Sequence, residues 1–254
     1  MTLPLIWRCT PAGQARLAEL GLKCSPDCDG MPVPEGPHLV CAVDADIRLI
    51  WAGEKGPNPL VVDFTQGKMG YRQRVRGRER LLDAVRPRQS AGSWQVLDAT
   101  GGLGRDAWMM AAEGMQVWLV ERHPVLHAML ADGLARAAED PAYREIASRI
   151  RLIHGEAQTL LEDATQSWDV VYLDPMFPPR EKSAAVKKDM QFLHALLGAG
   201  DSDSDALLAP ARCRARHNVV VKRPRHAPFL GGLAPHHQIA GKRGRFDVYT
   251  GLAN

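Results

Sequence analysis

The sequence lacks several features that would place the protein in a common class. It has no run of about 18 apolar residues, so no membrane-spanning helix is expected. No charged segment precedes an apolar stretch at the N-terminus, so no secretory signal peptide is predicted. It contains neither a Walker loop nor a serine nucleophile elbow, which argues against P-loop nucleotide hydrolysis and α/β-hydrolase chemistry. We therefore expect a cytoplasmic protein.

Cysteine is scarce, and neither cysteine nor histidine shows the spacing of metal ligands. The five cysteines are odd in number and fit free thiols better than a disulfide framework. Four of them lie in the first 41 residues, but Cys24 and Cys28 have no second pair at matching spacing. The nine histidines show no metal-ligand pattern either. The sequence predicts no metal site.

The net charge is small, but the basic residues are gathered. There are 32 basic and 29 acidic residues, which gives a net charge of +3. Basic runs occur at residues 68–88, 222–225 and 242–245, and the first holds eight basic residues interleaved with Tyr71. A single run of this kind is usually a solvated surface. Three runs in a nearly neutral chain favour phosphate contacts with a nucleic acid.

The sequence pattern changes near residue 90. Before it, short strand-like runs at 4–9, 38–43 and 47–51 and a helical patch at 15–20 predict a small α+β lobe over residues 1–90. We expect the basic segment of this lobe to contact RNA.

From residue 91 to residue 254, strand patterns alternate with helix patterns, which is typical of a mostly parallel sheet. Strands are expected at 94–98, 116–120, 151–154, 168–173 and 218–222, followed by a hairpin of 237–240 and 246–250. Helices are expected at 107–113, 124–138, 157–162, 186–197 and 206–214. The fold class is therefore α/β, with a seven-stranded sheet and an antiparallel C-terminal hairpin.

A glycine-rich turn, Asp98-Ala-Thr-Gly-Gly-Leu-Gly-Arg-Asp106, follows the first strand of this domain and leads into a helix. Glycines permit positive φ and close ligand approach, and the helix start presents unpaired N–H groups. The second strand ends at Glu121, 23 residues after Asp98, where an acid can bind the ribose hydroxyls. This order of elements predicts a site for an adenosine-containing cofactor.

Two cofactors remain open from the turn alone. Gly102 and Gly104, with an alanine three residues later, also satisfy the loose dinucleotide fingerprint for NAD. Two observations favour S-adenosylmethionine. Asp98 ends the strand, where it could meet the cofactor's amino group, and Arg105-Asp106 puts charge where a pyrophosphate would need bare N–H donors.

The fourth strand ends in Asp174-Pro-Met-Phe-Pro-Pro179, beside the expected cofactor crevice. An exocyclic amine of a nucleobase is a poor nucleophile, because its lone pair is delocalised into the ring. The Asp174 carboxylate and a carbonyl at or near Pro175 could accept its hydrogens, and Phe177 could stack on the base. A strand that ends in Asp-Pro is common in α/β proteins, so this motif alone does not predict a catalytic site. The prediction rests on its place at the end of the fourth strand, in a domain whose first strand ends in the glycine-rich turn. Basic residues that could contact phosphates follow: Arg180, Lys182, Lys187 and Lys188.

These motifs together resemble the ribosomal RNA small subunit methyltransferase J family. The likeness is carried by Asp98–Asp106, Glu121–Pro124, Tyr172–Pro178 with Lys187-Lys188, Val219–Pro224 and Arg245–Tyr249. The resemblance implies a class I, Rossmann-like methyltransferase fold and S-adenosylmethionine as cofactor. It also implies methylation of a guanosine N2 amine in bacterial 16S rRNA, within the small ribosomal subunit.

The resemblance adds site positions to those that the motifs indicate, including Arg122 and the segment Gly155-Glu156-Ala157 beside the adenine. The expected catalytic residues are Asp174, Pro175 and Phe177. The expected cofactor-binding residues are Asp98, Gly102, Gly104, Arg105, Asp106, Glu121, Arg122, Glu156, Ala157 and Asp174.

Other functions remain open at this point. A DNA amino-methyltransferase would share the acid-Pro-x-aromatic segment, and a non-catalytic RNA-binding assembly factor could retain the cofactor fold without turnover. An NAD-dependent reductase is less favoured. The sequence indicates no oligomeric state.

Overall fold

The computed structural model describes residues 2–23, 32–53, 56–66, 80–86, 94–176, 188–198, 204–241 and 244–253. The chain divides into two compact units. The first comprises Met1–Asp63, Ala128–Arg136 and Pro178–Gly200, and the second comprises Phe64–His127, Ala137–Phe177 and Asp201–Asn254. The two domains expected from composition, residues 1–90 and 91–254, stay a prediction.

The first unit contains a four-stranded sheet in the order β1-β2-β3-β4. Its strands are β1 (Leu5–Cys9), β2 (His38–Val43), β3 (Ile47–Ala52) and β4 (Leu60–Val61), and only the β1–β2 pair is parallel. Helix α1 (Pro11–Glu19) begins after Thr10, whose hydroxyl accepts a 3.1 Å hydrogen bond from the N–H of Gly13. That hydroxyl and the proline at the first helical position explain why the helix starts there. This unit also contains helix α8 (Lys188–Leu197).

The first unit contains a buried carboxylate. Asp132, on the middle part of α5 (Pro124–Glu139), is fully buried. It accepts hydrogen bonds from Arg16 at 2.9 Å, from Arg136 at 3.0 Å and from the N–H of Ile47 at 3.3 Å. A buried charge requires such partners, so this cluster ties α5 to α1 and β3 within the unit.

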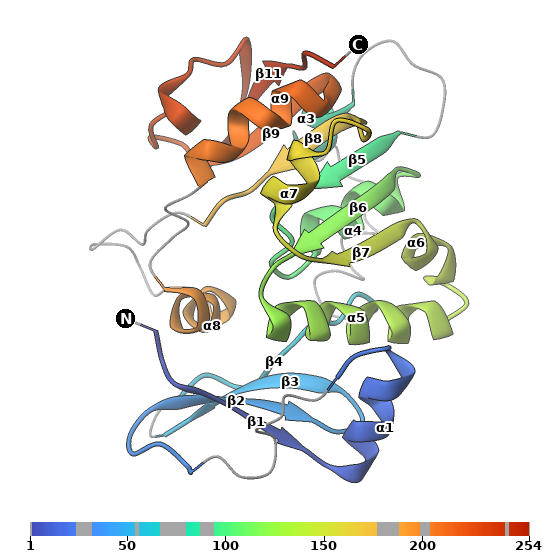
Figure 1. Ribbon diagram of the computed structural model, residues 1–254, viewed down its shortest axis with the longest axis vertical. Coiled ribbons are helices and arrows are strands. Elements are labelled where there is room, and N and C mark those ends of the chain that lie inside the picture. The colour runs from blue at the N-terminus through green and yellow to red at the C-terminus, as the bar shows by residue number, and fades with distance from the viewer. Residues whose placement is uncertain are drawn as a thin grey trace. The chain divides into compact units, whose positions relative to one another are not determined.

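The second unit contains a seven-stranded sheet in the order β10-β11-β9-β8-β5-β6-β7 (Figure 1). Its strands are β5 (Gln95–Asp98), β6 (Gln116–Glu121), β7 (Ile150–His154), β8 (Trp168–Leu173), β9 (Ala215–Pro224), β10 (His237–Ala240) and β11 (Gly244–Thr250). The five strands from β7 to β9 pair in parallel, whereas β11 pairs antiparallel with both β9 and β10. Its helices are α3 (Arg80–Val85), α4 (Arg105–Ala112), α6 (Arg144–Ser148), α7 (Ala157–Glu162) and α9 (Leu208–Arg214), with 3₁₀ turns at Ser204–Leu207 and Leu230–Gly232.

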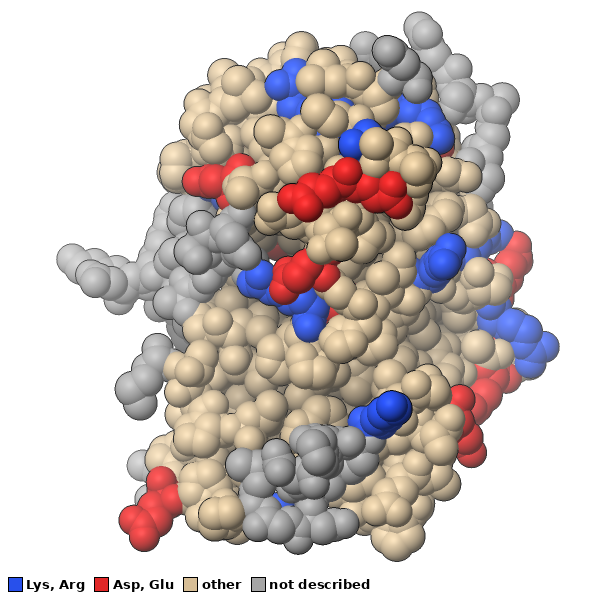
Figure 2. Space-filling model, in the orientation of Figure 1, with Lys and Arg blue, Asp and Glu red and all other residues tan. Residues whose placement is uncertain are grey.

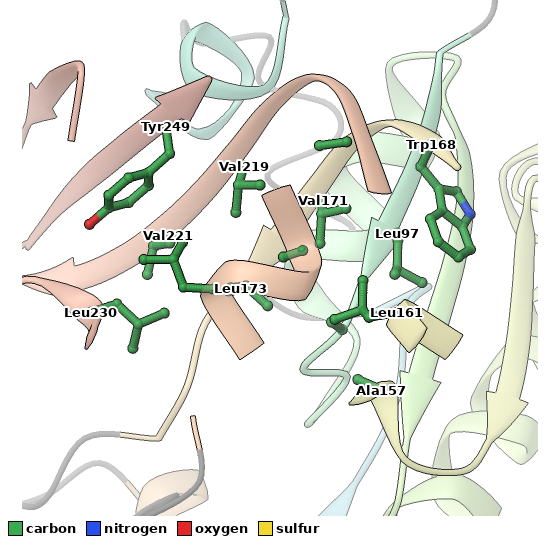
Figure 3. Close-up of a cluster of buried hydrophobic side chains, with 14 of the residues drawn as sticks. Leu97, Ala157, Leu161, Trp168, Val171, Leu173, Val219, Val221, Leu230 and Tyr249 are labelled. Carbon is green, nitrogen blue, oxygen red and sulfur yellow. The ribbon is translucent and has the colours of Figure 1, made fainter. Parts of the chain in front are cut away.

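The central strands are apolar because both faces of the sheet are covered. Helices α7 and α9 lie in front of the sheet in Figure 1, and the core beneath them includes Leu97, Val171 and Val219 from three neighbouring strands and Leu161 from α7 (Figure 3). Each of these four side chains is at most 1% exposed. Burial of each contributes about 1.5–3 kcal/mol, which accounts for a continuous run such as the Val-Val-Tyr-Leu of β8.

The predicted fold class is confirmed: the structure is α/β, with a mostly parallel seven-stranded sheet, an antiparallel C-terminal hairpin and a small α+β unit that contains the N-terminal strands. Two short α-helices and one short strand were not predicted, namely α3, α6 and β4. They have six, five and two residues, too few for a periodic pattern to show. Among the described residues, every helix is too short or too polar to span a lipid bilayer.

Candidate functional site

The glycine-rich turn connects β5 to α4 and is held against the end of β6. The N–H of Gly101 donates to the carbonyl of Val120 at 2.9 Å, and the N–H of Gly104 donates back to the carbonyl of Gly101 at 2.8 Å. A Cβ on Gly101 would lie 2.7 Å from that Val120 oxygen, so no larger residue fits without a shift of the backbone. Gly102 and Gly104 have φ of 54° and 67°, in the left-handed region that favours glycine.

Glu121 binds this turn with one oxygen of its carboxylate and the residue before α5 with the other. Oε2 accepts a 2.7 Å hydrogen bond from the N–H of Gly102, and Oε1 accepts one of 2.7 Å from the N–H of His123. The side chain is buried at the end of β6. An acid at this position, the end of the second parallel strand, can bind the hydroxyls of a ribose.

Asp98 lies at the end of β5, 2% exposed. Its Oδ1 accepts hydrogen bonds from the N–H and the hydroxyl of Thr100, at 3.1 and 3.4 Å. Burial raises the pKa of Asp98 to about 7, the hydrogen bonds from Thr100 oppose this rise, and the carboxylates of Asp106 and Asp174 add to it. The group therefore titrates near neutral pH.

Two carboxylates bind one ammonium group at this edge of the sheet. Lys222, from β9, donates to Oδ2 of Asp106 at 2.6 Å and to Oδ2 of Asp174 at 2.8 Å. The hydroxyl of Tyr172, from β8, donates to the same Asp106 oxygen at 2.6 Å. Together with the nearby Asp98, the cluster carries more negative than positive charge, which favours a cationic ligand.

Asp174 is positioned through its backbone as well as its side chain. Its N–H donates to the hydroxyl of Thr100 at 2.7 Å, which ties the end of β8 to the start of the glycine turn. Its side chain is 38% exposed, and Pro175 next to it is buried. Phe177, predicted to stack on a base, lies outside the described residues.

The remaining predicted site residues lie at the ends of neighbouring elements. Arg122, after β6, forms a 3.7 Å ion pair with Glu156, which precedes α7. Both side chains are exposed, and Ala157 behind them is buried. Arg105 is exposed at the first position of α4. The structure thus brings the described members of the predicted site to the carboxyl ends of β5, β6, β7 and β8.

The basic runs do not all face solvent, so part of the prediction about phosphate contacts is wrong. Arg223 and Arg245 are each 6% exposed, and their guanidinium groups donate to backbone carbonyls of the β9–β10 connection. Lys222 is bound to carboxylates. Arg225 remains exposed. Residues 67–79, 180–187 and 242–243, which hold most of the other basic positions, lie outside the described residues.

On the face shown in Figure 2, the basic and acidic side chains of described residues are interspersed. Lys188 is exposed on α8. The described residues contain no group of three metal-binding side chains, and Cys9, Cys41 and Cys213 are free thiols. Cys24 and Cys28 lie outside the described residues.

Sequence reasoning missed three members of the site: Thr100, Tyr172 and Lys222. Lys222 was attributed to a basic run that contacts phosphate. The sequence does carry a signal for it, because a charged residue follows three consecutive valines at the end of an expected buried strand. Its partner becomes visible only when β9 is known to lie beside β8.

The residues present fit S-adenosylmethionine. The three glycines of the turn lack a Cβ and so give a ligand room close to the backbone, and Glu121 is a buried acid at the end of the neighbouring strand, where an acid can bind ribose hydroxyls. The carboxylates of Asp106 and Asp174 carry the charge that a sulfonium and an ammonium group require.

Comparisons with known proteins agree with this geometry. A family model described as "Putative SAM-dependent methyltransferase" matches residues 33–251. The ribosomal RNA small subunit methyltransferase J of Hahella chejuensis is 46% identical over 215 residues, which cover 84% of this chain and 80% of that protein. The protein of the same name from Thioalkalivibrio sulfidiphilus is 43% identical over 243 residues, which cover 93% of this chain and 92% of that protein.

A solved structure supports the same assignment. The crystal structure of a SAM-dependent methyltransferase from Neisseria gonorrhoeae matches with a TM-score of 0.72 and 35% identity, over 97% of this chain and 95% of that one. The resemblance inferred from the motifs is confirmed. The chain belongs to the ribosomal RNA small subunit methyltransferase J family, whose cofactor is S-adenosylmethionine.

Proposed function

We propose that this protein methylates the exocyclic N2 amine of a guanosine in 16S rRNA, within the small ribosomal subunit of the bacterial cytoplasm. The names of the relatives support an rRNA substrate. The proposal that the target is an amine rests on one observation, the hydrogen bonding of the Asp174 carboxylate. Lys222 occupies its Oδ2, whereas its Oδ1 has no hydrogen-bond partner among the described residues.

S-adenosylmethionine supplies an electrophilic methyl group on a positively charged sulfur. Around it, the cofactor-binding residues are proposed to be Asp98, Gly102, Gly104, Arg105, Asp106, Glu121, Arg122, Glu156, Ala157 and Asp174. Glu121 binds the ribose hydroxyls, because it is the buried acid at the end of the second parallel strand. Asp106 binds the cofactor's ammonium group through the oxygen that Tyr172 and Lys222 leave open.

The target amine is held by the end of β8. Oδ1 of Asp174 accepts one N–H of the guanine N2, and the carbonyl at Pro175 accepts the other. These bonds direct the nitrogen lone pair toward the methyl carbon and stabilise the positive charge that develops on nitrogen. Once the nitrogen carries the methyl group, it would release one proton to solvent, which reaches the partly exposed side chain of Asp174. Phe177 stacks on the base that is taken out of its helix.

The test is transfer of a labelled methyl group to small ribosomal subunits from a strain that lacks this gene, followed by nucleoside analysis. We expect labelled N2-methylguanosine with the wild-type protein and none with Asp174→Ala. Label on DNA instead would favour an amino-methyltransferase of DNA. Cofactor binding without transfer to any nucleic acid would favour a non-catalytic assembly factor and would contradict the proposal.

A further inference from the structure

Lys222 joins two carboxylates that have different proposed partners. Asp106 begins α4, directly after the glycine turn, and Asp174 follows β8. Among the described residues, Lys222 is the one cation that donates to both, at 2.6 and 2.8 Å. The contact therefore links the cofactor side of the site to the target side.

The strand register places Lys222 there. Strands β8 and β9 pair in parallel, and the last pair is Leu173 with Val221. The next residue on each strand is Asp174 on one and Lys222 on the other, so the two side chains leave adjacent strands at the same level. The Lys222 side chain is 39% exposed, so a substrate or solvent can reach it.

Lys222 donates a hydrogen bond to one oxygen of each carboxylate and none to the other oxygen. It donates to Oδ2 of both Asp106 and Asp174. Among the described residues, neither Oδ1 accepts a hydrogen bond. A carboxylate held by one oxygen has a fixed orientation and a known direction for its second oxygen, which is what a positioned acceptor requires.

We propose that Lys222 is a positioning residue of the methyl-transfer site: it fixes Asp106 and Asp174 together, so that one presents its open oxygen to the cofactor and the other presents its open oxygen to the target amine. This inference rests on the proposed function, in which Asp174 binds the target amine. Lys222 itself touches neither the methyl group nor the amine.

The charges around Asp174 allow this role to be measured. The titratable and charged groups near the Asp174 carboxylate are Lys222 from β9, Asp106 from α4, Asp98 from β5 and Tyr172 from β8. Burial raises the pKa of Asp174, and Asp106 raises it as well, whereas Lys222 lowers it. Burial would lower the pKa of Lys222, but the two carboxylates outweigh burial and raise it, so the ammonium stays charged. Loss of Lys222 should therefore raise the pKa of Asp174 further.

The experiment compares Lys222→Met and Lys222→Arg with a matched control, Arg216→Met. Arg216 lies on the same strand at its opposite end, pairs with Asp169 at 3.4 Å and has a side chain 41% exposed. For each variant, kcat is measured against pH, the Kd of S-adenosylhomocysteine is measured by calorimetry, and the pKa of Asp174 is measured by carboxyl-carbon NMR.

In Lys222→Met, we expect kcat to fall about 100-fold, the effect of losing about an ångström of placement. The Kd should rise less than about threefold, because Tyr172 still donates to Asp106. The acid limb of the kcat profile, and the pKa of Asp174, should move to higher pH. Lys222→Arg keeps the charge, so it should keep the wild-type limb with an intermediate kcat, and Arg216→Met should match the wild type.

Wild-type kcat in Lys222→Met would overturn the inference. So would a loss of kcat with an unmoved acid limb and no recovery in Lys222→Arg, which would indicate a merely structural contact. If the wild-type protein itself transfers no methyl group, the proposed function fails, and the NMR measurement still decides on Lys222. An equal pKa of Asp174 in Lys222→Met and Arg216→Met would then refute its control of Asp174.

Discussion

The carboxylate of Glu121 accepts a 2.7 Å hydrogen bond from the backbone N–H of Gly102, so the acid expected to bind the ribose also holds the glycine turn in place. Its second oxygen is bound by the N–H of His123. One side chain therefore connects the end of β6, the turn after β5 and the start of α5. We therefore expect cofactor affinity and the stability of the turn to depend on the same group.

Glu121→Gln should weaken both properties, because an amide nitrogen cannot accept one of these two N–H groups. A buried donor left unsatisfied costs about 1–3 kcal/mol of unfolding free energy. The Kd for S-adenosylhomocysteine should rise at least about tenfold, as a loss of about 1.4 kcal/mol implies. Thermal unfolding and calorimetry measure the two effects. Glu145→Gln, at an exposed surface pair, is the control and should change neither. An unchanged Kd in Glu121→Gln would contradict the assignment to the ribose.

Gly101 is the glycine whose replacement should do most harm to the turn. Gly101→Ala places a Cβ 2.7 Å from the carbonyl oxygen of Val120, and backbone must move to relieve the contact. Overpacking of this kind costs about 1–3 kcal/mol, and we expect a lower melting temperature together with weaker cofactor binding. At Gly155 the added Cβ would meet no atom within 4 Å, so Gly155→Ala should leave the melting temperature nearly unchanged. Equal melting temperatures for the two variants would show that the turn tolerates a side chain.

Asp98 should make stability fall as the pH rises. Its folded-state pKa of about 7 lies above the ordinary value of 3.8, so between about pH 4 and pH 7 the folded protein retains a proton that the unfolded chain has released. The unfolding free energy that depends on Asp98 therefore decreases through this window and stays low above it. Asp98→Asn removes the titration and keeps an oxygen for the N–H of Thr100.

We expect Asp98→Asn to be more stable than the wild type above pH 7, by at most about 4 kcal/mol, which is about 1.4 kcal/mol per pKa unit. Urea unfolding at a series of pH values measures the difference. The two proteins should approach each other in stability toward pH 4. Curves that stay parallel from pH 4 to pH 8 would show that Asp98 does not titrate in this range.

Arg245 should prove to be structural. Its guanidinium group donates five hydrogen bonds, two to Asp247 and three to the carbonyls of Pro224, Arg225 and Ala227. Arg245→Met would leave the fully buried Asp247 without its cation, at a cost of about 3 kcal/mol or more. Chemical denaturation measures this loss. The control is Arg225→Met, an exposed side chain, for which a change within about 0.5 kcal/mol is expected. Similar unfolding free energies of the two variants would show that Arg245 does not stabilise the fold.

The sequence was sufficient to predict those features that depend only on residues close together in the chain. The strand, glycine turn and helix of residues 95–112 are local in the chain, and so is the Asp-Pro end of β8. The seven strands were predicted for the same reason, because each is a short apolar run between turn residues. The order of the strands in the sheet, which places β9 beside β8, was not predicted.

The sequence was not sufficient where a residue's role depends on a distant partner. Lys222 and Arg245 look like members of basic runs, and both are bound to carboxylates instead. Arg225, in the same run as Lys222, is exposed. Only the register of β9 against its neighbouring strands shows which of these basic residues is bound to a carboxylate and which is exposed. The raised pKa of Asp98 likewise comes first from burial in the folded protein and then from Asp106 and Asp174, which lie 8 and 76 positions further along the chain.

The central claim is that Asp174 holds the target amine, and the single-turnover rate of methyl transfer by Asp174→Asn to small ribosomal subunits tests it most directly. Cofactor binding is measured on the same preparation. We expect a rate at least about 100-fold below that of the wild type. Cofactor affinity should change less than about tenfold, because Glu121 and the glycine turn are intact. A rate near that of the wild type, with normal cofactor binding, would contradict the account.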